Sequence, residues 1–541
     1  IGGSNTYVAA TGTIDATGNL VLSAAQDIAF TGGAAAAGGD LAMTAGRNIT
    51  LGAATGTAAT DVEQHDYSHR ASQTENFGTT VSAGGNVQMA ALGGDLTLAG
   101  STVAAGESAT LMATGNVNLN AVTDSQSSYT RTVEHGFLNK TTTTSSESST
   151  DQVGSTVAAN DNVTMVSGRD MSVAGTVAGG GNVALKAGGS LTENALQSTA
   201  QSYYEKETKG LYFDTDGAKA HVGYGDSKES VSDSSTTWNP SMIASTAGTL
   251  DIAANGPVAI NASGVSAAKD LNVTGSSVSL NALSDVSSTK QTSDFKFIGV
   301  QVGLSGNSLV GQVASLALAA AQTASDKDMA SQSVDALSTA ESGVSIGETV
   351  ATLIDPKLAS TSPNVTRANI ELVGVQAEVG FEDNHKTSET TSTTAQGSVA
   401  EAGDGLTITA TGAVPATDRS AGDIIATAAS MSGETVMLAA PGNIQLGSGQ
   451  DTTQTIASQT ALSAFVGVTA SLNADMSWGV SVTGQLSASH SHTDSQSVTQ
   501  VDMTVSGAKN VTINNGAGRT TLDGAKVSGG SVDVTAGNLD I

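Results

Sequence analysis

The feature that most constrains this chain is a short unit in which a glycine-rich turn precedes a strand of alternating side chains. Within residues 84–98 the unit occurs twice, first as Gly-Gly-Asn before Val-Gln-Met and then as Gly-Gly-Asp before Leu-Thr-Leu. Apolar side chains at every second position place one face of each strand inward. Glycine adopts positive φ without a steric penalty, and Asn and Asp tolerate it while bonding their own backbone. The unit therefore predicts a turn, a strand, a second turn and a second strand.

This unit recurs at a spacing of about 21 residues, a repeat length that is typical of solenoid folds. Asn19 and Asp40 occupy equivalent positions, as do Asp95 and Asn116. A third short strand, such as residues 101–104, fits between the marked strands of one repeat. Three strands per turn of about 21 residues predict an all-β fold, a β-solenoid whose successive coils pair at about 4.8 Å. About 13 such coils would form a rod roughly 60 Å long.

The inward positions of the repeat carry Val, Leu, Ile, Ala and Met, which suit a narrow coil because small and branched side chains stack on those of the next coil. Asn and Asp at matching turn positions can also stack, as hydrogen-bonded ladders between coils. The alternative is that these residues serve only the local chemistry of each turn, and this is the interpretation that we favour from the sequence.

Composition and charge exclude several classes of function. The chain has 541 residues, of which 63 are Gly, 6 are Pro and none is Cys, so disulfide bonds and Cys-ligated zinc are excluded. Lys and Arg number 21 against 50 Asp and Glu, giving a formal net charge of −29, and no cluster of cations suits nucleic acid. The chain has no run of about 20 apolar residues, so no transmembrane helix is predicted. The chain lacks an initiator Met and ends within a strand pattern, so we expect it to be a fragment of a longer protein.

Five insertions interrupt what we expect to be one rod spanning residues 1–541. All seven His, both Trp and every aromatic residue except Tyr7 and Phe30 fall within the insertions. Their Ser/Thr-rich flanks enclose a centre of Gly and aromatic residues, and Thr suits a strand that is exposed on both faces. We interpret them as antiparallel β-hairpins that project from the rod, at about residues 60–80, 122–154, 194–240, 283–400 and 450–505.

The longest insertion begins with alternating Gly and apolar residues at 295–304, and related stretches follow at 372–381 and 465–472. Between the first two, Ser308 is positioned to cap a helix with an apolar stripe, and a second helix is predicted at about 329–337. The first is apolar for only about 13 residues, too short to cross a bilayer. We expect this small helical insertion to cover the sheet edge or to pack on the rod.

No catalytic or metal-binding constellation stands out in the sequence. Asp residues lie mainly at turns, where the turn explains them, and Arg residues are scattered. His65 and His69 have the spacing of two ligands on a helix but lack a third, and His490 and His492 share one strand face, so we interpret all four as solvated arm residues. We therefore predict no enzyme activity, no cofactor and no metal. The candidate surface contacts are the aromatic arm residues Tyr203, Tyr204, Tyr212, Trp238, Phe295, Phe297 and Trp478.

The repeated turn unit and the Ser/Thr-flanked insertions together resemble filamentous haemagglutinin-type exoproteins of two-partner secretion. The similarity covers essentially all of the chain, and is greatest to the haemagglutinin-repeat region of contact-dependent growth inhibition toxins and related large adhesins. It implies a right-handed parallel β-helix, secretion to the surface of a Gram-negative bacterium through an outer-membrane transporter, and contact with a target-cell receptor or outer membrane. The family's N-terminal secretion domain, which engages the transporter, is absent from this sequence, and no C-terminal effector is recognisable.

Two functional hypotheses follow, and the sequence leaves both open. In the first, the chain is a structural and delivery segment that displays or delivers a toxin, with alternating apolar arm residues such as Ile298, Val300 and Val302 facing lipid or the rod. In the second, it is a carbohydrate- or receptor-binding adhesin whose Tyr and Trp side chains stack on sugars. A polysaccharide lyase or hydrolase is a third and less favoured alternative, because no pair of carboxylates marks an active site.

Overall fold

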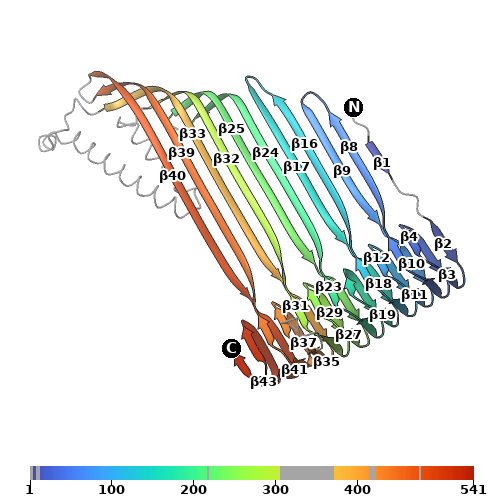
Figure 1. The fold of residues 1–541 in the computed structure, drawn as a ribbon. Coiled ribbons are helices and arrows are strands. Elements are labelled where there is room, and N and C mark those ends of the chain that lie inside the picture. The colour runs from blue at the N-terminus through green and yellow to red at the C-terminus, as the bar shows by residue number, and fades with distance from the viewer. Residues whose placement is uncertain (1–3, 8–11, 216–218, 305–370, 413–421, 474–476) are drawn as a thin grey trace.

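The computed structural model describes residues 4–7, 12–215, 219–304, 371–412, 422–473 and 477–541, without the side chains of residues 4–7 and 371–373. In these residues every regular element is a β-strand, and the strands form three sheets (Figure 1). Two of the sheets wrap around each other as a parallel β-helix, and the third is a layer of longer strands that rises from one side of this rod. The helices expected at 308–320 and 329–337 lie outside the described residues.

One side of the rod is a parallel ladder with one short strand per coil. Each strand pairs in register with the equivalent strand of the next coil, as Leu96 does with Ile49 and Val117. The twelve strands are β4 (Ile28–Thr31), β7 (Ile49–Gly52), β12 (Leu96–Ala99), β15 (Val117–Asn120), β20 (Met171–Val173), β23 (Leu191–Asn194), β28 (Val258–Asn261), β31 (Val278–Asn281), β36 (Ile424–Thr427), β38 (Ile444–Gly447), β42 (Arg519–Asp523) and β44 (Asn538–Asp540).

The other two sides of the rod belong to one 21-stranded parallel sheet that is bent at a corner. Its first side contains β2 (Thr13–Ala16), β5 (Ala34–Ala37), β10 (Thr80–Ala83), β13 (Thr102–Ala105), β18 (Ser155–Ala159), β21 (Gly175–Gly179), β26 (Met242–Ser245), β29 (Gly264–Ala267) and β34 (Val399–Ala402). Its second side contains β3 (Leu20–Ala24), β6 (Leu41–Ala45), β11 (Val87–Ala91), β14 (Ala109–Ala113), β19 (Val163–Ser167), β22 (Val183–Ala187), β27 (Leu250–Ala254), β30 (Leu271–Gly275) and β35 (Gly405–Ala410). Three strands span both sides, β37 (Ser430–Ala439), β41 (Met503–Asn514) and β43 (Ala525–Thr535).

The core of the rod is a set of stacked inward side chains. Met43, Met89, Leu111 and Met165 occupy equivalent positions in successive coils, and each is fully buried. The inward orientation predicted for Val87 is confirmed, because its side chain is 1% exposed. Stacking like on like keeps each coil equally wide, which lets the next coil pair along its whole length.

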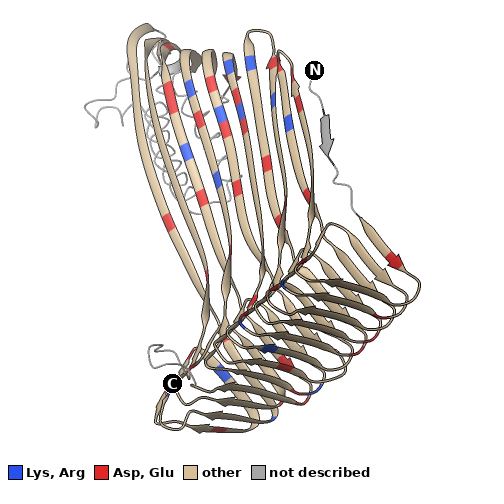
Figure 2. Cartoon of the chain, turned by 45° about the vertical axis from the view of Figure 1, so that its right-hand side comes forward, with Lys and Arg blue, Asp and Glu red and all other residues tan. Residues whose placement is uncertain are grey.

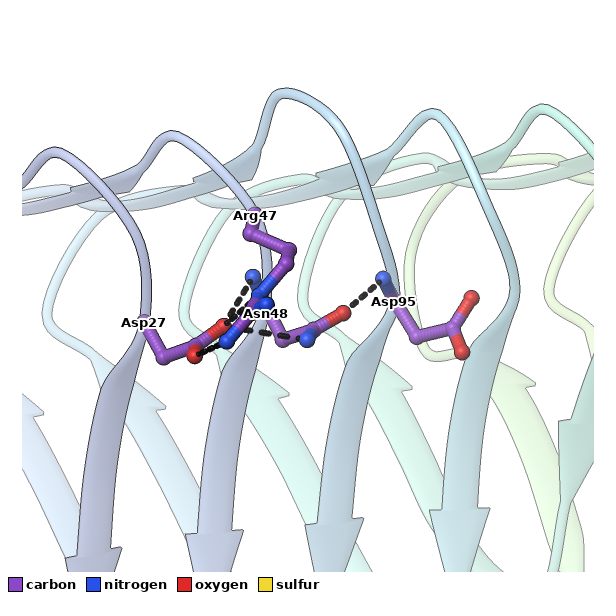
Figure 3. Close-up of polar contacts among 4 residues, drawn as sticks. All are labelled: Asp27, Arg47, Asn48 and Asp95. Atoms are coloured by element: carbon purple, nitrogen blue, oxygen red, sulfur yellow. Dashed lines mark hydrogen bonds and ion pairs between the residues drawn. The ribbon is translucent and has the colours of Figure 1, made fainter.

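Turn residues at two corners form hydrogen-bonded ladders, so our preference for local turn chemistry alone was wrong. At the first corner the amide N–H of Asp40 donates to Asn19 Oδ1 at 2.9 Å, and that of Asn86 donates to Asp40 Oδ1 at 2.9 Å. At the second corner Asn48 donates to Asp27 at 3.0 Å, and Asp95 to Asn48 at 2.9 Å (Figure 3). The acceptor of one coil therefore satisfies the backbone donor of the next, which a single turn considered alone does not show.

Asp27 begins the second ladder, and its carboxylate is stabilised by an ion pair with Arg47. The Arg47 guanidinium donates through Nε to Asp27 Oδ1 at 2.9 Å and pairs through Nη2 with Oδ2 (Figure 3). Hydrogen bonding from Arg47, followed by that from the Asn48 backbone, holds the pKa of Asp27 well below its ordinary value. The Asp27 carboxylate therefore stays ionised, and remains a hydrogen-bond acceptor for the next coil, to lower pH than an ordinary Asp does.

A ladder of buried hydroxyl groups forms the third corner, which the sequence analysis did not anticipate. Ser101 Oγ accepts the amide N–H of Thr79 at 3.0 Å and donates to the Leu51 carbonyl at 2.9 Å. Ser155 Oγ likewise donates to the Asn120 carbonyl at 2.8 Å, and both serines are buried. These hydroxyls satisfy backbone groups at the corner from which the long strands leave the rod.

The long strands form one continuous antiparallel sheet of eleven strands rather than separate hairpins (Figure 1). Neighbouring hairpins pair through β9 with β16, β17 with β24, β25 with β32, and β33 with β39. The strands are β1 (Ser4–Tyr7), β8 (Ala54–Glu63), β9 (Tyr67–Phe77), β16 (Val122–His135), β17 (Asn139–Val153), β24 (Leu196–Thr215), β25 (Lys219–Asn239), β32 (Leu283–Leu304), β33 (Glu371–Gln396), β39 (Gly449–Asn473) and β40 (Trp478–Val501).

The spacing of the coils explains why the hairpins join. The second, third, fourth and fifth hairpins each leave the rod two coils after the one before, because β10 to β12 and β13 to β15, for example, separate β9 from β16. Two coils advance about 9.6 Å, and a two-stranded hairpin is also about 9.6 Å wide. Each hairpin therefore emerges at hydrogen-bonding distance from the last one.

Candidate functional site

The antiparallel sheet has two chemically different faces, which its register defines. Directly paired residues of antiparallel neighbours point to the same face, and adjacent residues in one strand point to opposite faces. On β32, Ile298 pairs with Tyr224 and Phe381, whereas its neighbour Phe297 pairs with Gly225 and Glu382. We call the two sides the Ile298 face and the Phe297 face.

Far from the rod, the Ile298 face carries a large exposed apolar patch. Ile298 is 69% exposed, Val379 62% and Leu486 77%, although in a strand such residues are normally covered. Rows of such side chains cross six strands, from β24 to β40. The apolar patch comprises Leu211, Phe213, Val222, Tyr224, Ile298, Val300, Val302, Val375, Val379, Phe381, Val466, Val468, Trp478, Val480, Val482 and Leu486.

At the same level, the Phe297 face is buried on β32, β33 and β39, whereas it is exposed on the edge strand β40. Phe297 is 1% exposed and its ring lies 5.8 Å from that of Tyr212, edge to face. Gln301 Nε2 donates to Glu378 Oε2 at 2.5 Å, and Lys219 Nζ lies 3.7 Å from the same carboxylate. Gln301, Glu378 and Lys219 on this face thus have partners inside the protein, while the apolar side chains on the other face are exposed to solvent.

A belt of paired charges separates the apolar patch from the rod on the Ile298 face. Lys209 Nζ lies 3.3 Å from the Asp226 carboxylate on the next strand, and Lys296 Nζ lies 3.4 Å from that of Asp383. The hydrogen bonds that Lys209 donates to Glu207 and to Asp226 raise the pKa of Lys209, so it keeps its positive charge. Figure 2 shows basic residues in blue and acidic residues in red interspersed on the long strands, above the rod. Because the signs alternate, the belt is nearly neutral as a whole.

One known protein family matches the repeats along most of the chain. A family model described as hemagglutinin repeat matches residues 3–72, 60–138, 136–295 and 379–541. The chain belongs to the hemagglutinin-repeat family. Proteins of this family are secreted, cell-surface exoproteins of Gram-negative bacteria. No solved structure gives a significant match.

The relatives of this hemagglutinin-repeat chain are much longer proteins. The 16S rRNA endonuclease CdiA of Enterobacter cloacae is 31% identical over 467 residues, which cover 84% of this chain and 13% of that protein. The tRNA nuclease CdiA of Escherichia coli strain STEC_O31 is 30% identical, covering 79% of this chain and 13% of that protein. The tRNA nuclease CdiA-2 of Burkholderia pseudomallei is 27% identical over 94% of this chain and 16% of that protein. The chain thus spans about an eighth of the length of the first of these relatives.

The structure distributes the aromatic residues singled out in the sequence over both faces. Tyr212, Phe295 and Phe297 come together on the Phe297 face, with ring centroids of Tyr212 and Phe295 at 5.2 Å, and Tyr204 lies on the same face nearer the rod. The Ile298 face carries Tyr203, Trp238 and Trp478 at three different levels, of which only Trp478 lies in the apolar patch. A single sugar platform made of all seven is therefore not present.

Most residues of the apolar patch were not among the predicted surface contacts, because only aromatic residues were chosen as candidates from the sequence. The signal was present in the Gly-alternating stretches, where Val379 and Val466 take the same strand phase as Ile298. A second missed feature is an Asp at the third position of outgoing strands. Asp285 Oδ1 accepts the amide N–H of Trp238 at 2.7 Å, and Asp124 Oδ1 accepts that of Asn76 at 2.8 Å. These carboxylates join successive hairpins at their base.

The histidines named in the sequence analysis lie on the arms. His69 Nδ1 lies 3.0 Å from Thr130 Oγ1 and His490 Nδ1 lies 3.1 Å from Thr460 Oγ1, while His65 is exposed beside Asp66. Within the described part of the chain, no group of three or more His, Cys, Asp or Glu side chains is placed to hold a metal ion. Among the same residues, no helix is long and apolar enough to cross a membrane.

Proposed function

We propose that this chain is the structural and delivery segment of a secreted filamentous exoprotein that displays or delivers a toxin to a target cell. In this proposal one rod spans residues 1–541 and acts as a spacer, while the antiparallel sheet attaches to the target-cell surface. The relatives named as nucleases and toxins support a C-terminal effector elsewhere in the full-length protein, and an outer-membrane transporter as its secretion partner. The chain itself has no catalytic role in this proposal.

The observation that carries the proposal is the exposed apolar patch. Its sixteen side chains alternate with residues of the opposite face along each strand, which is the pattern of a β-strand that faces lipid. A patch of this extent on a soluble protein is typical of an interaction surface. We infer that its partner is the outer membrane of the target cell, with Trp478 at the free edge among the contacts.

The sheet is proposed to lie on the membrane rather than to cross it. An open sheet edge leaves backbone N–H and C=O groups unpaired, which hydrocarbon does not tolerate. Glu378 and Gln301 on the Phe297 face are polar and would also be unsuited to lipid. Attachment through one face buries the apolar patch and leaves the belt of paired charges at the level of the headgroups.

Substitutions on the edge strand β40 test this attachment. The double variant Val482→Lys with Leu486→Lys places two charges in the patch, on side chains that are 80% and 77% exposed, so folding is preserved. Burying a Val or Leu side chain contributes about 1.5–3 kcal/mol, so we expect vesicle binding to fall at least tenfold. The measurement is flotation of the protein with phosphatidylcholine vesicles at low and high salt.

The matched control is Ser481→Lys with Ser487→Lys, which puts the same charges on exposed neighbours of the opposite face. Binding by this control is expected to equal that of the unmodified chain at both salt concentrations, because the attraction is apolar. If the two double variants lose binding equally, or if neither loses it, the apolar patch is not the membrane-binding surface.

A further inference from the structure

A groove of about 700 Å³ crosses the Ile298 face close to the rod, from β8 to β25. It lies between two rows of side chains, each of which takes one residue from every strand. The wall farther from the rod consists of Asp61, Arg70, Tyr129, Ser146, Tyr203 and Ser232. The nearer wall consists of Ala59, Ser72, Ser127, Ser148, Gln201 and Ser234. We call this space the Tyr129–Tyr203 groove.

The floor of the groove is backbone, because the residues between the two walls point to the other face. Ser202 is one of them, and its Oγ donates to Asp233 Oδ2 at 3.1 Å on that side. The groove therefore runs straight across six strands, for roughly 24 Å at the usual strand spacing. Its long axis is perpendicular to the strands, so any ligand in it meets a new strand about every 4.8 Å.

Two phenol rings stand on one wall of the groove. Tyr129 on β16 and Tyr203 on β24 are separated by one strand, which places them about 9.6 Å apart on the same side. Both are half-buried. The Tyr203 hydroxyl donates to Glu205 on the side away from the groove, and burial together with this bond raises the pKa of Tyr203 to about 12. This bond holds the ring in place and leaves its carbon atoms toward the groove.

The other wall offers one small polar group per strand. Ser72 Oγ and Ser127 Oγ lie 2.8 Å apart across neighbouring strands, and Ser148 and the Gln201 amide continue the row. The wall has no charged side chain. On the opposite wall Arg70 is paired with Asp61 at 3.5 Å and with Glu63 at 3.2 Å. The groove thus combines aromatic surface with hydroxyl and amide groups and has no surplus of positive charge for an anionic ligand.

We propose that the Tyr129–Tyr203 groove binds an extended, uncharged, β-linked glycan that lies across the strands with one sugar ring per strand. In such a chain each pyranose ring advances by nearly one strand spacing, and alternate rings present the same side. Tyr129 and Tyr203 therefore contact two alternate rings, while the serine row bonds to ring hydroxyls. An extended peptide advances about 6.8 Å for every two residues and falls out of step with the strands.

The opposite face provides an internal comparison. A groove of about 760 Å³ crosses the Phe297 face one residue nearer the rod, over much the same region. Its lining is Ser, Thr, Gln, Ala, Asp and Glu without an aromatic ring. The aromatic rings therefore distinguish the two grooves and assign glycan binding to the Ile298 face. The proposal is independent of membrane attachment, because seven residues of strand and the belt of paired charges separate Tyr203 from Leu211 and the rest of the apolar patch.

Calorimetric titration of the full chain tests the assignment with two uncharged hexasaccharides. Chitohexaose is β-linked and extended, and maltohexaose is α-linked and curved. We expect chitohexaose to bind and maltohexaose to bind at least tenfold more weakly. Tyr203→Ala and Tyr129→Ala are each expected to weaken chitohexaose binding by roughly five- to tenfold, the value of one aromatic contact. Tyr203→Phe keeps the ring and is expected to retain binding within about twofold.

The matched control is Tyr204→Ala, which removes the neighbouring ring on the opposite face. Its chitohexaose affinity is expected to stay within twofold of the unmodified chain, and near-ultraviolet circular dichroism confirms that each variant is folded. The proposal is overturned if chitohexaose does not bind at millimolar concentration, if maltohexaose binds equally well, if a Ser/Thr-rich hexapeptide competes on equal terms, or if Tyr204→Ala weakens binding as much as Tyr203→Ala.

Discussion

Replacing Glu193 with Leu is expected to stabilise the rod at neutral pH by about 1–3 kcal/mol, the usual cost of leaving a buried polar group without a hydrogen-bond partner. Glu193 occupies an inward position of β23, stacked between Val173 of one coil and Ile260 of the next. Its side chain is fully buried and neither carboxylate oxygen has a hydrogen-bond partner. The inward residues that surround it in its own coil, such as Leu191 and Leu185, are apolar, and no charged group faces it from β20, β22 or β28.

Burial in this apolar environment raises the pKa of Glu193 well above its ordinary value of 4.5. The folded state prefers the neutral acid, so ionisation of this group adds no cost below pH 4.5, and that cost grows as the pH rises above 4.5. Aspartates with lowered pKa values, such as Asp27 and Asp40, act on the acid side instead.

Hydrogen exchange of the backbone amides in β20, β23 and β28 is the suitable measurement, because a long solenoid does not unfold in a single two-state step. In the unmodified chain these amides are expected to lose protection relative to the other coils as the pH rises above 4.5. Glu193→Leu should abolish that loss, and Glu193→Gln should abolish the pH dependence while keeping a buried polar group. Equal pH dependence in all three proteins would show that Glu193 does not titrate in this environment.

Removing the fourth hairpin is expected to split the antiparallel sheet and abolish membrane attachment while leaving the rod folded. Deletion of residues 282–396 joins Asn281 to Gly397 and Ser398, which reproduces the Gly100-Ser101 corner that connects β12 with β13 without an insertion. The coil-to-coil ladder of the rod therefore stays continuous. The sheet, in contrast, loses β32 and β33, which leaves β25 and β39 about 14 Å apart, each with one unpaired edge.

The deletion removes six of the sixteen residues of the apolar patch, namely Ile298, Val300, Val302, Val375, Val379 and Phe381. At 1.5–3 kcal/mol for each buried side chain, vesicle binding is expected to fall by more than about 100-fold. Deletion of residues 53–77, the first hairpin, is the control, since it contains no residue of the patch and should leave binding unchanged. Retained binding by the 282–396 deletion, or loss of amide protection in β30 and β35 of the rod, would contradict the account.

The coil was predictable from the sequence because the interactions that define it are mostly local to a single repeat. The strand phase of Val87 and Leu96 decides which side chains are buried, and the glycine turns decide where each strand ends. The alternation of Leu191 with Glu193 also places the carboxyl group inward, although a carboxylate in a solenoid core is not expected from its residue type. Stacking between coils was harder to predict, because the Asp27 and Asn48 ladder depends on register between residues about 21 positions apart.

The sequence analysis did not predict that the hairpins join into one sheet, although the spacing of the insertions explains it. Insertions are separated by two repeats of about 20 residues, and two coils equal one hairpin in width. The faces of that sheet could not be assigned from the sequence in the same way. Phe297 and Ile298 are adjacent and both apolar, so the alternation alone does not show which one is buried. That distinction depends on what covers each face, which is a property of the whole molecule.

The central claim is that hairpins from separate coils pair in register as one sheet, and a disulfide bond tests it most directly. The chain has no native cysteine, and Ser72 Oγ on β9 lies 2.8 Å from Ser127 Oγ on β16, across the junction between two hairpins. Ser72→Cys with Ser127→Cys is therefore predicted to form an intramolecular disulfide readily under mild oxidation. Ser72→Cys with Ser128→Cys places the second thiol on the opposite face and should not. Failure of the first pair to form, or equal formation by both pairs, would contradict the account.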